Sequence, residues 1–201
     1  MIFSLAILAT VLAYTWVIDP IAPGWVTPIP VALVLGLGIW RAIRSGDWGL
    51  APAALLPALW QSAAFTAAAT FMIYLTGSRL GTWHDRHDAW TSLALLIPWG
   101  LGQQFALHTV FLREAQATVG RPAGIWLAAA LFAALHLPNP FLSAMTFLGA
   151  LAWSWIYDRH PHLLPLAFSH AVLTLAILYA FDEATTGHLR VGAAYLRLSQ
   201  R

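Results

Sequence analysis

Cysteine and lysine are both absent from the sequence, and charged residues make up only 9% of it. Without cysteine, the chain cannot form disulfides, thiolate nucleophiles or thiolate metal sites, and its redox compartment is left open. The basic residues are all arginine, and they are scattered over polar loops rather than gathered into a patch. We therefore expect no nucleic-acid partner.

The scarcity of charge is matched by an excess of apolar residues. Hydrophobic residues make up 60% of the chain and the mean hydropathy is +0.70, whereas an ordinary soluble domain is about 25% charged. This composition is typical of an integral membrane protein embedded in a lipid bilayer. Because lipid offers no hydrogen bonds to the backbone, the apolar runs are expected to be helices. The sequence predicts one all-α polytopic membrane domain over residues 1–201.

Short polar loops divide the chain into hydrophobic segments. We place seven segments, at residues 2–18, 26–43, 50–76, 90–112, 123–137, 140–157 and 162–181. The third is about 27 residues long, so it either crosses with tilt or is broken into two helices near Pro57. The prediction is therefore a bundle of seven to eight transmembrane helices. Residues 182–201 form a polar tail, which is either a short amphipathic segment on the membrane or a disordered terminus.

The arginines also indicate an orientation in the membrane. If the crossings alternate, several arginines share the side of the amino terminus, namely Arg41, Arg44, Arg113, Arg121 and Arg159. The positive-inside rule then favours a cytoplasmic amino terminus. The sequence carries no recognisable organelle signal, so we expect a bacterial inner (plasma) membrane.

Five polar side chains stand out because they fall inside or at the end of hydrophobic segments. They are Gln103, Gln104, His108, His136 and His170. Polar groups at membrane depth are costly, so they usually face a cavity or a partner. Gln104 and His108 are four residues apart and therefore share one face of a helix. Gln103 is displaced by about 100° and borders the same groove.

The histidines are candidates for a metal site. His136 is followed by Leu137-Pro138-Asn139-Pro140, and because proline disfavours helix in the residue before it, the helix should end near His136. His170 lies near the middle of the last segment. Three imidazoles plus water form a known catalytic zinc arrangement, which three converging helices can supply. The alternative is that each histidine makes one interhelical hydrogen bond and nothing more.

The order of these residues resembles three motifs of the CPBP (CAAX-processing and bacteriocin-immunity) membrane proteins, relatives of the type II CAAX prenyl endopeptidase. That family shows Glu-Glu-x-x-x-Arg, then Phe-x-x-x-His, then an intramembrane His with Asn four residues on. Gln103, Gln104 and His108 stand at the first motif, Phe132 and His136 match the second, and His170 with Thr174 stands at the third. The resemblance covers residues 90–181.

The resemblance implies intramembrane peptide-bond hydrolysis, in which the first glutamate activates a water held near the histidines. Glutamine can orient water but cannot take its proton. His108 is the alternative base, because imidazole titrates near neutrality. Glu114 lies six residues beyond His108 and about 240° further around the helix, so it is not expected to be the base.

Two classes of function follow. The first is a divergent metal-dependent hydrolase or endopeptidase that acts on a membrane-embedded peptide or protein. Its catalytic residues would be Gln103, Gln104 and His108, and a divalent metal would be held by His136, His170 and His108, with zinc as the first choice and cobalt or iron as alternatives. The second is a catalytically inactive scaffold, a pseudoenzyme, that binds a peptide, a lipid or a partner protein. Histidine-ligated haem is a third, weaker alternative.

Overall fold

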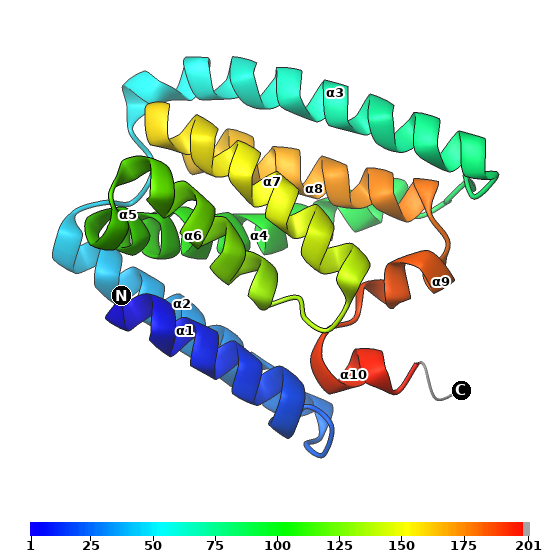
Figure 1. Ribbon diagram of the computed structural model, residues 1–201, viewed down its shortest axis with the longest axis horizontal. Helices are drawn as coiled ribbons and strands as arrows, with labels where there is room; N and C mark the ends of the chain where they lie inside the picture. Colours follow the sequence, from blue (N-terminus) through cyan, green and yellow to red (C-terminus); the bar gives the residue numbers. More distant parts are fainter. Residues whose placement is uncertain (199–201) are drawn as a thin grey trace.

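The computed structural model of the protein describes residues 1–198. These residues are 82% helical and contain no β-strand, apart from an isolated antiparallel bridge between Leu50 and His162. The predicted all-α class is confirmed. Figure 1 shows the long helices running back and forth between two ends of a bundle.

The helices follow the predicted hydrophobic segments closely. The main elements are α1 (Ile2–Ala13), α2 (Pro28–Ser45), α3 (Leu55–Leu80), α4 (Ala89–Phe105), α5 (Arg113–Val119), α6 (Arg121–Ala134), α7 (Pro140–Arg159), α8 (Leu163–Ala180), α9 (Glu183–Thr186) and α10 (Gly192–Leu196). Two stretches are π-helical, Tyr14–Ile18 after α1 and Ala106–Leu112 between α4 and α5. Single 3₁₀ turns lie at Gly24–Val26, Pro52–Ala54 and Gly187–Leu189.

Two helix boundaries differ from the prediction. The break near Pro57 is absent, because Pro57 lies in the first turn of α3, where a missing N–H group removes no helical hydrogen bond. The fourth segment does not stop at residue 112, since helix continues through α5 to Val119. The third segment is therefore one continuous helix from Leu55 to Leu80 rather than two.

Within residues 1–198, three helical stretches are long and apolar enough to cross a membrane, Gly24–Ser45, Pro52–Leu80 and Leu163–Ala180. The fifth segment is shorter, because α6 has 14 residues and so a length of about 21 Å. The count of seven to eight crossings stays a prediction.

The two ends of the bundle carry the charged groups. At one end, Arg113 pairs with Asp47 at 2.8 Å and Arg121 pairs with Asp158 at 3.0 Å. At the other end, the hydroxyl of Tyr179 donates to the backbone oxygen of Arg86 at 3.0 Å. Arg113 and Arg121 thus share one end, opposite Arg86, as the alternation of the segments predicts.

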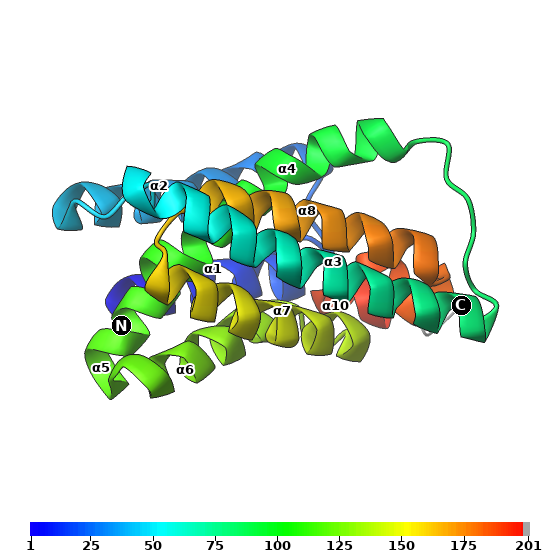
Figure 2. The same cartoon turned by 90° about the horizontal axis from the view of Figure 1, so that it is seen from above.

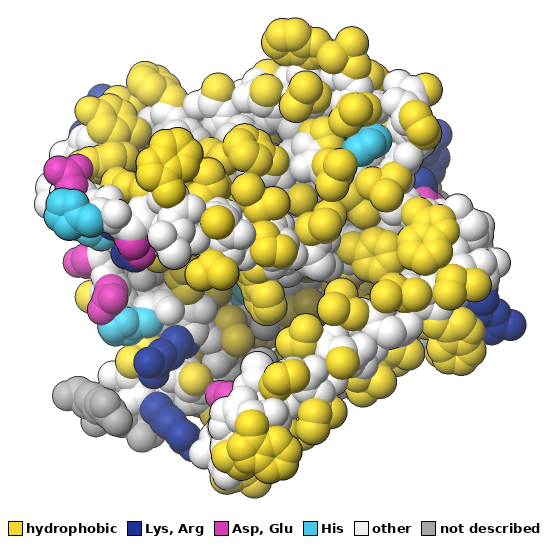
Figure 3. All heavy atoms as spheres, turned by 180° about the vertical axis from the view of Figure 1, so that it is seen from behind, with side chains coloured by type: hydrophobic (Ala, Val, Ile, Leu, Met, Phe, Trp, Pro, Cys, Tyr) yellow, Lys and Arg dark blue, Asp and Glu magenta, His cyan; other side chains and the backbone are white. Residues whose placement is uncertain are grey.

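The surface between the ends is apolar. Large side chains such as Trp60 (69% exposed), Trp90 (84%) and Leu95 (69%) lie on it. Figure 3 shows one face covered mainly by hydrophobic side chains, with the charged ones gathered towards the two ends. A continuous apolar surface of this kind is not stable in contact with water. It is the surface of an integral membrane protein in contact with lipid.

Glycines allow α8 to pack closely between α3 and α4. A Cβ atom at Gly100 of α4 would lie 3.0 Å from the carbonyl oxygen of Ala167 and 3.6 Å from the Cβ atom of His170. Gly77 of α3 meets the backbone of Ala180 in the same way. Figure 2 shows α8 running beside α3, with α4 on its other side. Small residues at helix contacts are typical of membrane bundles.

The carboxyl-terminal part folds back onto the bundle. The N–H group of Gly192 donates to the carbonyl of Leu137 at 2.8 Å, and the guanidinium of Arg197 donates to the carbonyl of Pro20 at 3.0 Å. The alternative of a disordered tail is therefore wrong for residues 182–198, which include the short helices α9 and α10, and the amphipathic segment on the membrane stays a prediction. The predicted polar tail also includes residues 199–201, which lie outside the described residues.

The glycine contacts predict opposite effects for two matched substitutions. Gly77→Ala should lower the free energy of unfolding by about 1–3 kcal/mol, because the added methyl group meets the backbone of α8. Gly36→Ala should raise it by up to about 1 kcal/mol, because alanine favours helix and nothing lies within 4 Å of that position. Denaturant unfolding in detergent micelles measures both. Equal effects would contradict the packing described for Gly77.

Candidate functional site

The fold brings four of the predicted polar residues into one neighbourhood. Gln104 lies in the last turn of α4, His108 in the π-helical stretch, and His170 on α8. His136 lies two residues after the end of α6. All four side chains are buried, with exposed fractions of 0% for Gln104 and His108, 8% for His170 and 9% for His136.

Gln104 and His170 join α4 to α8 directly. Nε2 of Gln104 lies 3.1 Å from Nδ1 of His170. The imidazole of His170 also stacks on the indole of Trp153, with ring centres 4.7 Å apart and planes inclined by 19°. The absence of a side chain at Gly100 leaves room for this contact, because that position faces the carbonyl oxygen of Ala167 and the Cβ atom of His170.

The amide of Gln104 has one unpaired atom. Its Oε1 is buried and has no hydrogen-bond partner among residues 1–198. An amide rotated by 180° places Oε1 against Nδ1 of His170, because oxygen and nitrogen occupy equivalent positions. In that orientation Nδ1 donates its proton and Nε2 carries the free lone pair of His170. In the other orientation, Nδ1 accepts and Nε2 carries the proton.

The tautomer of His108 is fixed by its backbone partner. Nδ1 lies 3.0 Å from the carbonyl oxygen of Gln104, and because a carbonyl only accepts, Nδ1 carries the proton. In the neutral ring Nε2 is then an acceptor. The backbone of Trp153 approaches the ring, but no hydrogen bond of good geometry forms at Nε2 within the described chain. This buried lone pair has no donor.

The backbone around His108 is π-helical, which the sequence did not reveal. Segments of this kind appear mostly as single turns inserted in α-helices, frequently at functional sites. Here two side chains form hydrogen bonds to backbone carbonyls of the preceding turn. Nδ1 of His108 donates to the carbonyl of Gln104, and the hydroxyl of Thr109 donates to the carbonyl of Phe105 at 2.7 Å. Side chains that bind the backbone in this way compete with regular helix.

His136 is held in the same manner as His108. Its Nδ1 lies 2.9 Å from the carbonyl oxygen of Phe132, so Nδ1 donates and Nε2 keeps its lone pair. The Phe132 ring meets His136 edge-on at 5.1 Å and His170 edge-on at 6.4 Å. Phe132 thus has two roles. Its backbone carbonyl accepts the hydrogen bond from His136, and its ring contacts both His136 and His170.

The predicted helix break after His136 is present. Helix α6 ends at Ala134, and Asn139 caps α7 by accepting the N–H group of Leu142 at 3.0 Å. The Asn139 amide also donates to the carbonyl of Thr186 at 2.8 Å. The carboxyl-terminal segment therefore supports the turn that follows the histidine.

Gln103 and Glu114 stand apart from this group. Oε1 of Gln103 is buried, and the described residues offer it no partner. The carboxylate of Glu114 accepts from the N–H and hydroxyl groups of Ser4, at 2.8 and 2.6 Å. Glu114 thus caps the start of α1, in agreement with the expectation that it is not the base.

Two aromatic residues at the site were missed from the sequence. Trp153 stacks on His170, and Tyr157 stacks on His108 with ring centres 4.6 Å apart. They are four residues apart on α7 and so lie on one face. That spacing was visible, but aromatic pairs at helical spacing are common in hydrophobic cores and do not single out a site.

The described side chains contain no group of three or more His, Asp and Glu residues placed to hold a metal ion. The three-histidine metal site therefore stays a prediction. The contacts found around the four site residues are with amide, backbone and aromatic groups.

One comparison with known proteins finds a match to a protein family. Residues 85–176 match the family model described as type II CAAX prenyl endopeptidase Rce1-like. The matched range includes every predicted site residue and agrees with the range of the resemblance noted in the sequence. No curated protein and no solved structure matches the chain.

The different surroundings of the two glutamines predict different effects of the same substitution. Gln104→Met should lower the free energy of unfolding by about 1–3 kcal/mol, because it leaves Nδ1 of His170 without its partner. Gln103→Met should lower it by much less, since the lost amide makes no hydrogen bond in the described structure. Denaturant unfolding in detergent provides the comparison. A larger loss at position 103 would show that the pairing is wrong.

Proposed function

Since the chain carries an Rce1-like domain of the type II CAAX prenyl endopeptidase family over residues 85–176, we propose that it is a divergent intramembrane hydrolase. It cleaves a peptide bond in a membrane-embedded peptide or protein. Gln104, His108, His136 and His170 line its site, and the host membrane is a bacterial inner membrane.

The observation that carries this proposal is the unpaired lone pair on Nε2 of His108. The backbone carbonyl of Gln104 fixes the proton on Nδ1, so Nε2 is held ready to accept one. A general base requires this state at the atom that faces the water. Neither glutamine can take that role, because a neutral amide does not accept a proton at neutral pH.

Each side chain has a distinct part in the reaction. Oε1 of Gln104 accepts a hydrogen bond from the water, and Nε2 of His108 takes the water's other proton as its oxygen attacks the carbonyl carbon of the peptide. The new C–O bond forms, the C–N bond then breaks, and His108 returns the proton to the leaving nitrogen. The buried surroundings strengthen these polar contacts relative to water.

In a second form of the proposal, Nε2 of His108 would bind a divalent metal instead of taking the proton from water. His108 and His136 both direct Nδ1 to a main-chain carbonyl, which is how metal-binding histidines are commonly oriented. His170 joins them as a third donor when the Gln104 amide is rotated. Zinc, or alternatively cobalt or iron, would lower the pKa of a bound water and so make hydroxide available near neutral pH.

The altered first motif favours a second candidate, a scaffold without hydrolytic activity. Gln103 and Gln104 replace the glutamate pair of the family, so the site lacks the base that the family would use. Such a scaffold would bind a peptide, a lipid or a partner protein in the same place. Loss of the carboxylates is the specific observation in its favour.

Hydrolysis of a defined probe separates the two candidates. The probe is a fluorogenic peptide with one transmembrane helix, reconstituted with the full chain in liposomes. His108→Ala should lower the rate by about 10²- to 10⁴-fold, the usual contribution of a general base. His87→Ala is the matched control in an exposed loop and should leave the rate unchanged. No cleavage by the wild type, across probes that vary in sequence, would favour the scaffold.

Metal analysis tests the cofactor separately. The purified wild type, loaded with zinc and dialysed at neutral pH, should retain stoichiometric metal by plasma mass spectrometry. His136→Ala and His170→Ala should each lose it, because each removes a ligand, while His87→Ala should retain it. The metal site is wrong if the wild type retains no zinc, cobalt or iron under these conditions.

A further inference from the structure

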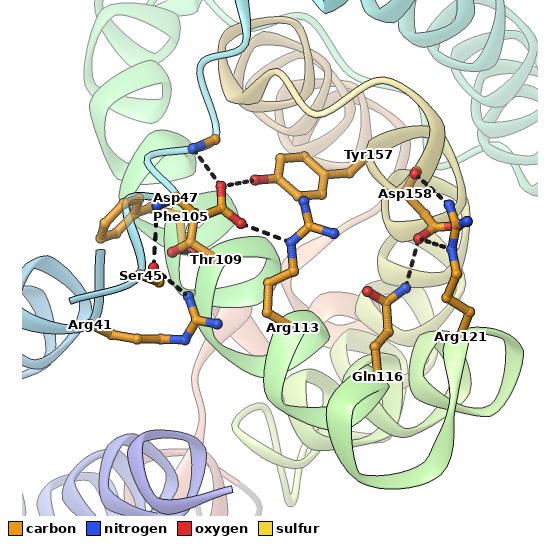
Figure 4. Close-up of polar contacts among 11 residues, drawn as sticks. Arg41, Ser45, Asp47, Phe105, Thr109, Arg113, Gln116, Arg121, Tyr157 and Asp158 are labelled. Atoms are coloured by element: carbon orange, nitrogen blue, oxygen red, sulfur yellow. Dashed lines mark hydrogen bonds and ion pairs between the residues drawn. The ribbon is translucent and has the colours of Figure 1, made fainter. Parts of the chain in front are cut away.

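A cluster of polar side chains at one end of the bundle adjoins the site through Tyr157. Figure 4 shows Asp47, from the loop between α2 and α3, with dashed lines joining its carboxylate to the side chains of Arg113 and Tyr157. These residues come from three segments that are distant in the sequence. None of them belongs to the motifs that identified the site.

The carboxylate of Asp47 connects the three segments. Its Oδ2 accepts from Nε of Arg113 at 2.8 Å, and its Oδ1 accepts from the hydroxyl of Tyr157 at 3.4 Å. The N–H group of Gly49 also donates to Oδ1 at 3.1 Å. A Cβ atom at Gly49 would come within 2.7 Å of the Tyr157 hydroxyl, so the loop can approach only because residue 49 lacks a side chain.

Tyr157 also contacts His108, and so links Asp47 and Arg113 to the site. Its ring stacks on the imidazole of His108 with ring centres 4.6 Å apart and planes inclined by 20°. The guanidinium carbon of Arg113 lies 5.1 Å from the centre of the same tyrosine ring, within the range of a cation–π contact. Tyr157 is fully buried, so its ring is confined by these neighbours.

The π-helical stretch makes this double contact possible. His108 and Arg113 are five residues apart, which in a regular α-helix would place them about 140° apart around the axis. In a π-helix the hydrogen bonds join residues five apart, so such residues lie near the same side. The stretch Ala106–Leu112 therefore lets both side chains reach one tyrosine ring.

We propose that Asp47, Arg113 and Tyr157 are positioning residues that fix the plane of the His108 imidazole and thereby the direction of its free Nε2 lone pair. The hydrogen bond from Nδ1 to the backbone leaves the ring free to tilt about that bond. Stacking on a confined tyrosine removes this freedom. The effect on hydrolysis rests on the proposed function, whereas the effect on the His108 ring does not.

The neighbouring ion pair offers a matched control. Arg121 and Asp158 pair at 3.0 Å at the same end of the bundle, and Gln116 also donates to Asp158 at 2.7 Å. Figure 4 shows this second group beside the first. No hydrogen bond or ring contact joins Asp158 to His108 in the described residues. Asp158→Asn therefore removes a similar charge whose hydrogen bonds go to Gln116 and Arg121 rather than to the tyrosine.

The test is nitrogen-15 NMR of labelled histidines in the full chain in lipid nanodiscs, with the His108 signals assigned by His108→Gln. The wild type should show a single Nδ1-protonated form of His108. Asp47→Asn and Tyr157→Phe should broaden these signals or add the Nε2-protonated form, and Asp158→Asn should leave them unchanged. Tyr157→Phe keeps the ring, so it tests the proposal even if Asp47→Asn does not fold.

Kinetics on the peptide probe supply the second readout. Asp47→Asn should lower kcat by roughly 10- to 100-fold with little change in KM, because it misplaces a reacting group rather than the substrate. Unchanged His108 signals in both variants, or the same change in Asp158→Asn, would overturn the proposal. If the signals change as expected but the wild type cleaves no probe, the positioning role stands and the proposed hydrolysis fails.

Discussion

The contact between Gln104 and His170 depends on how closely α4 and α8 approach each other. Polar side chains in lipid must be satisfied within the protein, because the surrounding solvent offers them no hydrogen bonds. The closely packed position at Gly100 lets the amide and the imidazole meet at 3.1 Å. The indole of Trp153 stacks on the imidazole of His170. Gln104 and His170 meet because α4 and α8 are close enough to share one hydrogen bond.

A second principle organises the other two histidines. His108 and His136 each bind the carbonyl four residues earlier, at 3.0 and 2.9 Å. The backbone thus orients both imidazoles, and no carboxylate is needed to do so. The orientation of these two rings therefore does not depend on the side chain at position 104, because the acceptor there is a backbone carbonyl.

The polar ends of the bundle and the buried site are not independent. Charged groups gather at the ends because their burial in lipid is expensive, yet Tyr157 reaches from Asp47 to His108 through stacking and a hydroxyl contact. An aromatic residue with a polar tip suits this task, since its ring tolerates an apolar environment while its hydroxyl finds a partner. The loop at Asp47 thereby influences a residue inside the membrane domain.

The sequence by itself determined the membrane class, the helical segments, the end of helix near His136 and the polar side chains that are buried among the helices, because hydropathy, proline and spacing along the chain are local signals. It did not determine the π-helical stretch, the continuity of α3 through Pro57 or the different surroundings of Gln103 and Gln104. It also did not identify Trp153 and Tyr157. These features depend on which side chains meet across helices far apart in the sequence, and only the tertiary structure decides that.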